Sequence, residues 1–277
     1  MRLFYFLTFV SILGAGSCNF INPVEKTPTF IHIDSFQFTP NPEMGSASHK
    51  ITNIRISLDN ELIGVFDLPA NIPILMDKPG VLGMTPGIDY SGLTDIQITY
   101  PFYTSDTATI SPNPGKTQNI TPTTGYYSDT TFNKLFEDFE VTNSFGLITG
   151  DDSMVRTQHP AEVFEGKYSG KITVNASADK SEYALLNFFG APSQCFLELN
   201  YKGNIPIEIG MQTTDGENLL YYYGLNASDS WKKIYIGLQD FIVQYPNKLY
   251  VLVIKTTPKN ASGGYVLLDN IKILSRK

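Results

Sequence analysis

The chain has 277 residues, of which 42% are hydrophobic and only 17% are charged, and its formal net charge is −7. This composition excludes an intrinsically disordered chain, and the negative charge argues against nucleic-acid binding and against electrostatic adhesion to anionic lipid. Sixteen tyrosines and 18 phenylalanines favour strands over helices. We therefore expect an all-β protein that has no nucleic-acid partner.

The N-terminus has the three regions of a secretory signal peptide. A single positive charge at Arg2 precedes an apolar run over residues 3–13, and small residues at 14–17 lead directly to Cys18. The apolar run is shorter than the ~20 residues that are needed to span a bilayer. Residues 1–17 are therefore predicted to be a cleaved signal peptide.

The small residues ahead of Cys18 resemble the signal of bacterial lipoproteins, in which the cysteine is lipidated and becomes the first residue. Ala15 departs from that pattern, because the family usually has leucine there. The resemblance implies an outer-membrane lipoprotein that is anchored through acyl chains on Cys18, facing either the periplasm or the cell surface. Residues 18–28 then form a lipidated tether. The alternative is an ordinary signal peptide, cut near Ala15 or Ser17, and a soluble secreted protein.

Residues 29–125 are predicted to form an immunoglobulin-like β-sandwich. Apolar and polar residues alternate in FIHIDSFQF and NIRISL, as is typical of half-buried strands, and Asp59-Asn60 is expected to form the turn of a hairpin. The recurring strand, turn and proline pattern resembles immunoglobulin-like surface modules, which serve as spacers or binding platforms. A segment rich in Pro, Thr and Gly follows, and we place a linker at residues 126–134.

Residues 135–277 are predicted to form a second β-sandwich, a jelly roll, because about eight strand patterns occur without a convincing helix. The motifs FEDFE, SWKKIYIGLQDF and GGYVLLDNIKIL resemble the galactose-binding-like jelly rolls that include many carbohydrate-binding modules. The resemblance implies glycan binding and a structural Ca²⁺, although no cofactor is required. The candidate ligands for this ion are Glu137, Asp138, Glu140 and Asp269. A turn-capping role for Asp269 is the alternative.

The run NLLYYYGLN is a candidate ligand platform, because sugar rings stack on exposed aromatic side chains. A strand turns at least one of three consecutive tyrosines outward, and nearby polar side chains supply hydrogen bonds. The predicted platform consists of Tyr221, Tyr222, Tyr223, Gln212, Asp215 and Asn218. The alternative is that the tyrosines only cover one face of a sheet.

Two further features concern single residues. Cys195 occupies an apolar position of an alternating strand, so we expect a buried thiol that packs as a small hydrophobe. The tripeptides DTA, DTT and DSM resemble the sites that some Gram-negative lineages O-glycosylate in exported proteins. The residues that this resemblance implies are modified are Thr107, Thr130 and Ser153.

The sequence contains no recognisable catalytic motif. Its three histidines are scattered, without a second ligand at metal-site spacing. Asp151, Asp152 and Asp240 are the acids that a glycosidase could pair, but each lies in a turn-like segment where a solvated carboxylate is expected. We therefore predict a non-enzymatic envelope lipoprotein whose jelly roll binds a glycan or a partner protein. The alternatives are a structural accessory subunit of an outer-membrane assembly and, less favoured, a glycoside hydrolase.

Overall fold

The computed structural model describes residues 25–276 except 41–45, 176–179, 193 and 258–262, and of residues 131–136 it describes only the backbone. The predicted signal peptide and Cys18 therefore lie outside the described residues. None of the helices in the described part of the chain is long and apolar enough to cross a membrane.

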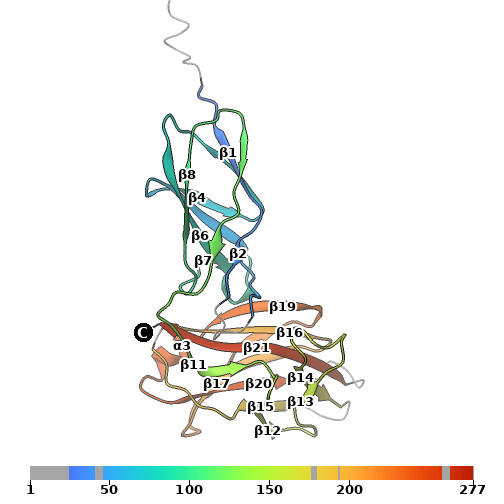
Figure 1. The fold of residues 1–277 in the computed structure, drawn as a ribbon. Coiled ribbons are helices and arrows are strands. Elements are labelled where there is room, and N and C mark those ends of the chain that lie inside the picture. Colours follow the sequence, from blue (N-terminus) through green and yellow to red (C-terminus); the bar gives the residue numbers. More distant parts are fainter. Residues whose placement is uncertain (1–24, 41–45, 176–179, 193, 258–262, 277) are drawn as a thin grey trace, which may run out of the picture.

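The N-terminal domain is a β-sandwich (Figure 1). Its strands are β1 (Thr29–Ile33), β2 (Gln37–Phe38), β3 (Asn53–Leu58), β4 (Glu61–Asp67), β5 (Ala70–Ile74), β6 (Gly80–Asp89), β7 (Gln97–Thr99), β8 (Asp106–Ile110), β9 (Thr117–Asn119) and β10 (Thr123–Thr124), with a 3-10 turn, η2 (Tyr90–Gly92). One sheet has the order β5-β1-β9, and the other has the order β4-β3-β6-β7, with β8 also paired to β6. Strands β2 and β10 form a short parallel pair.

The predicted hairpin of this domain is confirmed. Strands β3 and β4 pair in antiparallel fashion, and Asp59 and Asn60 between them have positive φ angles of 51° and 70°. Asn and Asp tolerate this left-handed region better than most residues, which is why they are favoured in two-residue hairpin turns. The alternation of β3 then places Ile54 and Ile56 in the core of the sandwich.

The second domain is a larger sandwich. Its elements are β11 (Thr130–Glu137), β12 (Phe145–Thr149), β13 (Val155–Thr157), β14 (Ser169–Val174), β15 (Ser181–Leu185), β16 (Cys195–Gly203), β17 (Ile207–Thr213), β18 (Leu219–Leu225), β19 (Ser228–Gly237), α3 (Gln239–Gln244), β20 (Tyr250–Thr256) and β21 (Gly264–Arg276). A six-stranded sheet has the order β13-β14-β21-β16-β19 with β11 on β21, and a five-stranded sheet has the order β12-β15-β20-β17-β18. The prediction of an all-β chain with two sandwiches is confirmed.

Two details differ from the sequence-based expectation. Strand β11 begins at Thr130, inside the predicted linker at 126–134, and pairs with the last strand, β21. A register shift within β11 breaks its alternation, which hides the strand in the sequence. The short helix α3 was not expected either. It connects β19 to β20 and buries Phe241 and Ile242.

Aromatic side chains of both sandwiches share one hydrophobic cluster, which we call the junction cluster. Its members are Phe38, Ile88, Tyr100, Phe102 and Tyr103 from the N-terminal domain and Phe196, Tyr235 and Leu274 from the jelly roll. The ring of Tyr100 meets those of Tyr103, Phe196 and Tyr235 edge to face, with centroids 4.7, 5.4 and 4.8 Å away. Each such pair contributes ~0.5–1.5 kcal/mol beyond the burial of its area. The cluster thus holds the six-stranded sheet against the N-terminal domain.

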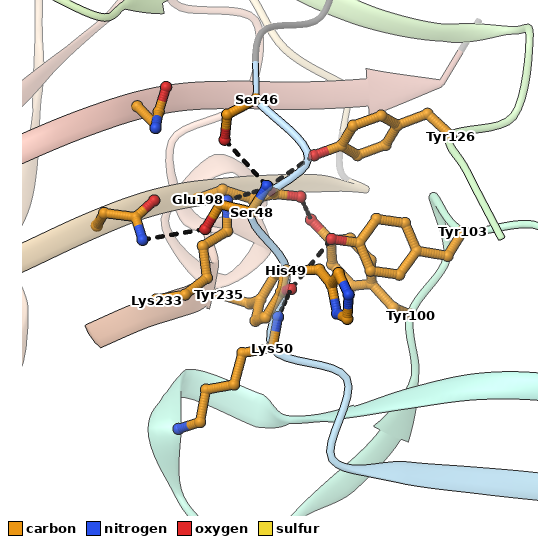
Figure 2. A network of polar contacts seen from close by, with 12 residues as sticks. Ser46, Ser48, His49, Lys50, Tyr100, Tyr103, Tyr126, Glu198, Lys233 and Tyr235 are labelled. Atoms are coloured by element: carbon orange, nitrogen blue, oxygen red, sulfur yellow. Dashed lines mark hydrogen bonds and ion pairs between the residues drawn. The ribbon is translucent and has the colours of Figure 1, made fainter. Parts of the chain in front are cut away.

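A buried ion pair lies within the same junction (Figure 2). The side chains of Glu198 on β16 and Lys233 on β19 are 0% and 3% exposed, and their charged atoms are 2.7 Å apart. Tyr100 and Tyr126 of the N-terminal domain donate hydrogen bonds to the two carboxylate oxygens at 2.8 and 2.9 Å. The backbone N–H of Lys50 donates to the hydroxyl of Tyr235 at 2.8 Å. Polar as well as apolar contacts therefore fix the orientation of the jelly roll.

Candidate ligand-binding face

The outward surface of the five-stranded sheet is the part of the jelly roll that faces away from the N-terminal domain (Figure 1), and we call it the distal face. On its central strand, β20, Tyr250, Leu252 and Ile254 belong to the core of the sandwich. Side chains alternate along a strand, so Val253 and Lys255 point to the distal face. The same alternation assigns the outward residues of the four neighbouring strands.

The register of the five strands places a row of small and medium side chains across the distal face, ending at a tyrosine. The row is Gly146, Ala184, Val253, Gly210 and Tyr221. A Cβ atom on Gly210 would lie 2.8 Å from Cδ1 of Tyr221, closer than real Cβ contacts allow. Glycine at this position therefore lets the tyrosine side chain lie close over the sheet.

Charged groups surround the Tyr221 ring. Its hydroxyl donates to Oε1 of Glu182 at 3.1 Å, and Nζ of Lys255 lies 4.4 Å from the ring centroid. Lys255 also pairs with Glu208 at 2.8 Å, and Lys180 pairs with Glu182 at 3.1 Å. Burial and the charge of Glu182 raise the pKa of Tyr221, so its hydroxyl stays protonated. These charges pair with one another, which gives the face fixed donors and acceptors without a net charge.

The three consecutive tyrosines do not form one platform. Tyr221 lies on the distal face, whereas Tyr222 packs edge-on against Phe241 of α3, with ring centroids 5.6 Å apart. Tyr223 lies beside Tyr90 of η2, and the pKa of Tyr90 is raised by burial and then by its hydrogen bond with Tyr223. The reason is a register shift between β17 and β18, which interrupts the alternation of side chains at this point.

The predicted polar partners also separate. Gln212 on β17 is opposite Val251 and Leu219 and is half-buried. Asp215 and Asn218 instead hold the turn between β17 and β18. Oγ1 of Thr213 donates to Asp215 at 2.5 Å and accepts from Nδ2 of Asn218 at 3.3 Å. Of the predicted platform, only Tyr221 and Gln212 lie on the distal face.

Four exposed apolar side chains were missed in the sequence, and two of them adjoin the distal face: a Cβ atom on Gly146 would lie 2.7 Å from Cδ2 of Leu186, and Leu219 is opposite Gln212. Leu186, Phe188, Leu219 and Leu249 are 67%, 63%, 47% and 44% exposed. Phe189 and Tyr250 are buried and form an isolated bridge, and their preceding neighbours Phe188 and Leu249 are the exposed ones. The doublets Phe188-Phe189 and Leu249-Tyr250 carried this signal, since alternation turns one member of each outward. We call these four residues the apolar patch.

Three of the four predicted calcium ligands meet at one place. Asp138, Glu140 and Asp269 line a cavity of about 170 Å³ together with Glu165, but Glu137 does not. The backbone N–H groups of Lys167 and Tyr168 donate to Glu140, those of Phe139 and Ser144 donate to Glu137, and the hydroxyl of Ser169 donates to Asp269 at 2.6 Å. Among the described residues, no three His, Cys, Asp or Glu side chains are placed to hold a metal ion. In this structure the acids accept hydrogen bonds, and a structural calcium ion at this cavity stays a prediction.

The protonation of Asp269 predicts a pH dependence of stability. Burial raises the pKa of this carboxyl to about 7, and the charge of Glu165 adds to the shift. The folded state therefore holds a proton that the unfolded state has lost between about pH 4 and 7, so the unfolding free energy falls as the pH rises through that window, by up to ~4 kcal/mol. We expect Asp269→Asn to remove this fall in urea unfolding measured with EDTA at the two ends of the window.

Adding calcium to the same measurement separates the two interpretations of this cluster, internal hydrogen-bond acceptors and a calcium site. If the acids only accept internal hydrogen bonds, adding CaCl₂ leaves the unfolding free energy of the wild type and of Asp269→Asn unchanged. A calcium-dependent stabilisation of the wild type alone, with no decrease between pH 4 and 7, would show that Asp269 is an ionised metal ligand.

The acids considered for glycoside hydrolysis lie at opposite edges of the five-stranded sheet. Asp151 and Asp152 follow β12, and Oδ2 of Asp152 accepts a hydrogen bond from Asn175 at 2.8 Å. Asp240 is in the first turn of α3, near Tyr222 on β18. Four strand spacings between β12 and β18 amount to roughly 19 Å, beyond the ~5–10 Å of a catalytic pair. The structure does not bring these carboxylates together.

The remaining single-residue expectations have mixed outcomes. Cys195 is fully buried, and burial raises the pKa of its thiol to about 12, which confirms an unreactive packing residue. Thr130 is only 6% exposed in β11, so the structure does not leave it accessible to an O-glycan. Thr107 and Ser153 are exposed and remain the candidates for modification.

The comparisons with known proteins concern the fold. No family model and no curated protein matches the sequence. A carbohydrate-binding module of the β-sandwich superfamily with promiscuous specificity is 17% identical, covers 81% of this chain and 85% of its own, and has a TM-score of 0.40. A family 11 module from Clostridium thermocellum, in complex with a β-1,3-1,4-mixed-linked tetrasaccharide, is 14% identical over 50% of this chain and 92% of its own, with a TM-score of 0.36. At these values the chain is similar to carbohydrate-binding modules in its β-sandwich fold and no further.

Proposed function

We propose that the protein is a non-enzymatic envelope lipoprotein whose distal face binds a neutral glycan. The observation that carries the proposal is the side chain of Tyr221, which lies close over Gly210 among mutually paired charged groups. Aromatic rings stack on the apolar faces of sugars, and fixed polar groups then accept or donate hydrogen bonds to the hydroxyls. Because the charges of Glu182, Glu208, Lys180 and Lys255 are internally paired, a neutral ligand is favoured over a charged one.

The arrangement of the domains supports an anchored binding protein. The described chain starts at the end of the N-terminal domain that is remote from the jelly roll, so the distal face points away from that start (Figure 1). Lipidation of Cys18 at the outer membrane would then place the N-terminal domain as a spacer below the binding face.

We expect Cys18→Ser to release the protein into the soluble fraction, measured by membrane fractionation. A variant that still sediments with the outer membrane would contradict a lipid anchor.

The glycan proposal predicts a loss of affinity in Tyr221→Ala. Loss of the ring should weaken binding of a glycan selected on an array by about tenfold, corresponding to ~1.4 kcal/mol, in isothermal titration calorimetry. The matched control is Tyr265→Ala, which removes a tyrosine of the six-stranded sheet whose centroid lies 5.8 Å from Nζ of Lys171. Equal affinities of the wild type and Tyr221→Ala for the glycan would contradict the proposed site.

A second candidate function rests on the apolar patch. Exposed apolar side chains that gather on one surface mark interfaces in soluble proteins, which favours an accessory subunit that docks to an envelope protein. The two functions differ in a pull-down from the native envelope. A stoichiometric partner that is retained by Tyr221→Ala and lost by Phe188→Ser would support docking, provided that the array shows no glycan.

A further inference from the structure

A second cavity, separate from the distal face, opens between the two sandwiches, and we call it the junction cavity. Its volume is about 640 Å³, within the ~300–1,000 Å³ of ligand sites, which are common at domain interfaces. The N-terminal domain contributes Tyr90, Ile96, Ile98, Thr99 and Pro101, and the jelly roll contributes Gln194, Phe196 and Gln239. All eight lining residues are uncharged.

The cavity combines aromatic walls with amide groups. The rings of Tyr90 and Phe196 meet edge to face at 6.0 Å and 83°. Nε2 of Gln239 donates to the hydroxyl of Tyr90 at 2.6 Å, which fixes the amide. Oε1 of the same amide is buried and has no hydrogen-bond partner among the described residues. This oxygen lies against Gly237 and has almost no accessible surface, so the polar side chains that the cavity offers to a ligand are those of Thr99 and Gln194.

The backbone of β19 is shaped for this arrangement. A Cβ atom on Gly237 would lie 2.2 Å from the hydroxyl oxygen of Tyr90 and 2.6 Å from Oε1 of Gln239. Only glycine therefore allows both polar groups to approach this strand. The hydroxyl of Tyr90 and the amide of Gln239 are brought together by the ends of three elements, η2, β19 and α3, from both domains.

We propose that the junction cavity binds a neutral saccharide, as a site additional to the distal face. A charged ligand would meet no opposite charge among the lining residues and would lose its hydration. A wholly apolar ligand would desolvate the polar side chains of Thr99 and Gln194 without giving them hydrogen-bond partners. A pyranose ring avoids both costs, because its apolar face can pack on Tyr90 and Phe196 and its hydroxyls can form hydrogen bonds with Thr99 and Gln194.

The test uses the full chain and a panel of neutral tetrasaccharides of glucose, mannose and galactose, with an oligogalacturonate as the charged probe and a neutral apolar peptide as the alternative occupant. Binding is measured by calorimetry in the Tyr221→Ala background, which isolates the junction from the distal face. Thr99→Trp, at an exposed position of the cavity wall, should abolish binding, and Gln194→Leu should weaken it at least tenfold. Thr109→Trp, at an exposed threonine on β8, is the matched control and should bind like its parent.

Each outcome decides the assignment. Tetrasaccharide binding that is lost in Thr99→Trp but kept in Thr109→Trp supports it. The assignment is overturned if Thr99→Trp leaves tetrasaccharide binding unchanged or if the oligogalacturonate binds more tightly than the tetrasaccharides. It is also overturned if only the apolar peptide binds and Thr99→Trp abolishes that binding. The distal site is tested by a separate comparison. If the distal site does not bind glycan, the wild type and Tyr221→Ala have equal affinities, while Thr99→Trp still abolishes binding at the junction cavity. A wild type that binds no probe overturns both sites.

Discussion

Glu198→Ala is expected to destabilise the protein by about 3–5 kcal/mol, the cost of breaking a buried ion pair from one side. The substitution leaves the ammonium group of Lys233, 3% exposed, without its carboxylate partner. It also removes the acceptor of the hydrogen bonds that Tyr100 and Tyr126 donate from the other domain. Each hydroxyl left unpaired in the junction adds its own desolvation penalty.

The pH dependence of this effect follows from the charge state of Glu198. Burial by itself raises the pKa of the carboxyl, but the charges of Lys233 and Lys272 and the hydrogen bonds outweigh it, so the net pKa is lowered. A lowered pKa means that the stabilisation is present above the unfolded value of ~4.3 and is lost as the pH falls through the folded value. The difference between the wild type and Glu198→Gln should therefore shrink in acid.

The measurement is urea unfolding of the full chain, with Glu208→Ala as the matched control. Glu208 pairs with Lys255 at 2.8 Å, but the two side chains are 41% and 21% exposed, and exposed pairs contribute only ~0–1 kcal/mol. We expect a large loss for Glu198→Ala and a small one for Glu208→Ala. Similar losses of unfolding free energy in the two variants would show that the buried pair contributes no more to stability than an exposed pair.

The sequence was sufficient for the fold because strand alternation is a local property. The segments FIHI and NIRISL already show which face is buried, and the left-handed turn at Asp59-Asn60 follows from two residues. In CFLELNY the alternation puts Cys195 and Glu198 on opposite faces of the strand, and the structure confirms that Cys195 lies in the core of the jelly roll. What the sequence did not show is that another domain covers the face of Glu198, because this depends on contacts between residues 98 and 72 positions apart.

The candidate site was less predictable for a related reason. Three tyrosines in succession predict at least one outward ring, and Tyr221 lies on the distal face, but a register shift between two strands decides where Tyr222 and Tyr223 lie. A register shift of one residue exchanges the two faces of a strand, and no residue in YYYG indicates that a shift occurs there. The junction cavity likewise depends on Tyr90 and Gln239 meeting over Gly237, a contact that arises only once the sandwiches dock.

Docking of the two sandwiches should also make them unfold together, and Tyr100→Ala should separate them. The ring of Tyr100 is fully buried and contacts Phe196 and Tyr235 of the jelly roll. Its hydroxyl donates a hydrogen bond to Glu198. Truncating a buried aromatic costs about 3–5 kcal/mol, and here the loss falls on the surface that couples the domains. We expect one calorimetric transition in the wild type and two in Tyr100→Ala.

Phe36→Ala is the control that separates coupling from simple destabilisation. Phe36 is buried in the core of the N-terminal sandwich and is not part of the junction cluster, so its loss weakens one domain while the interface stays intact. A coupled pair should then still unfold in a single transition at a lower temperature, with equal calorimetric and van't Hoff enthalpies. If Phe36→Ala also splits the transition, the sandwiches are independent and the buried network of Glu198 orients them without joining their stabilities.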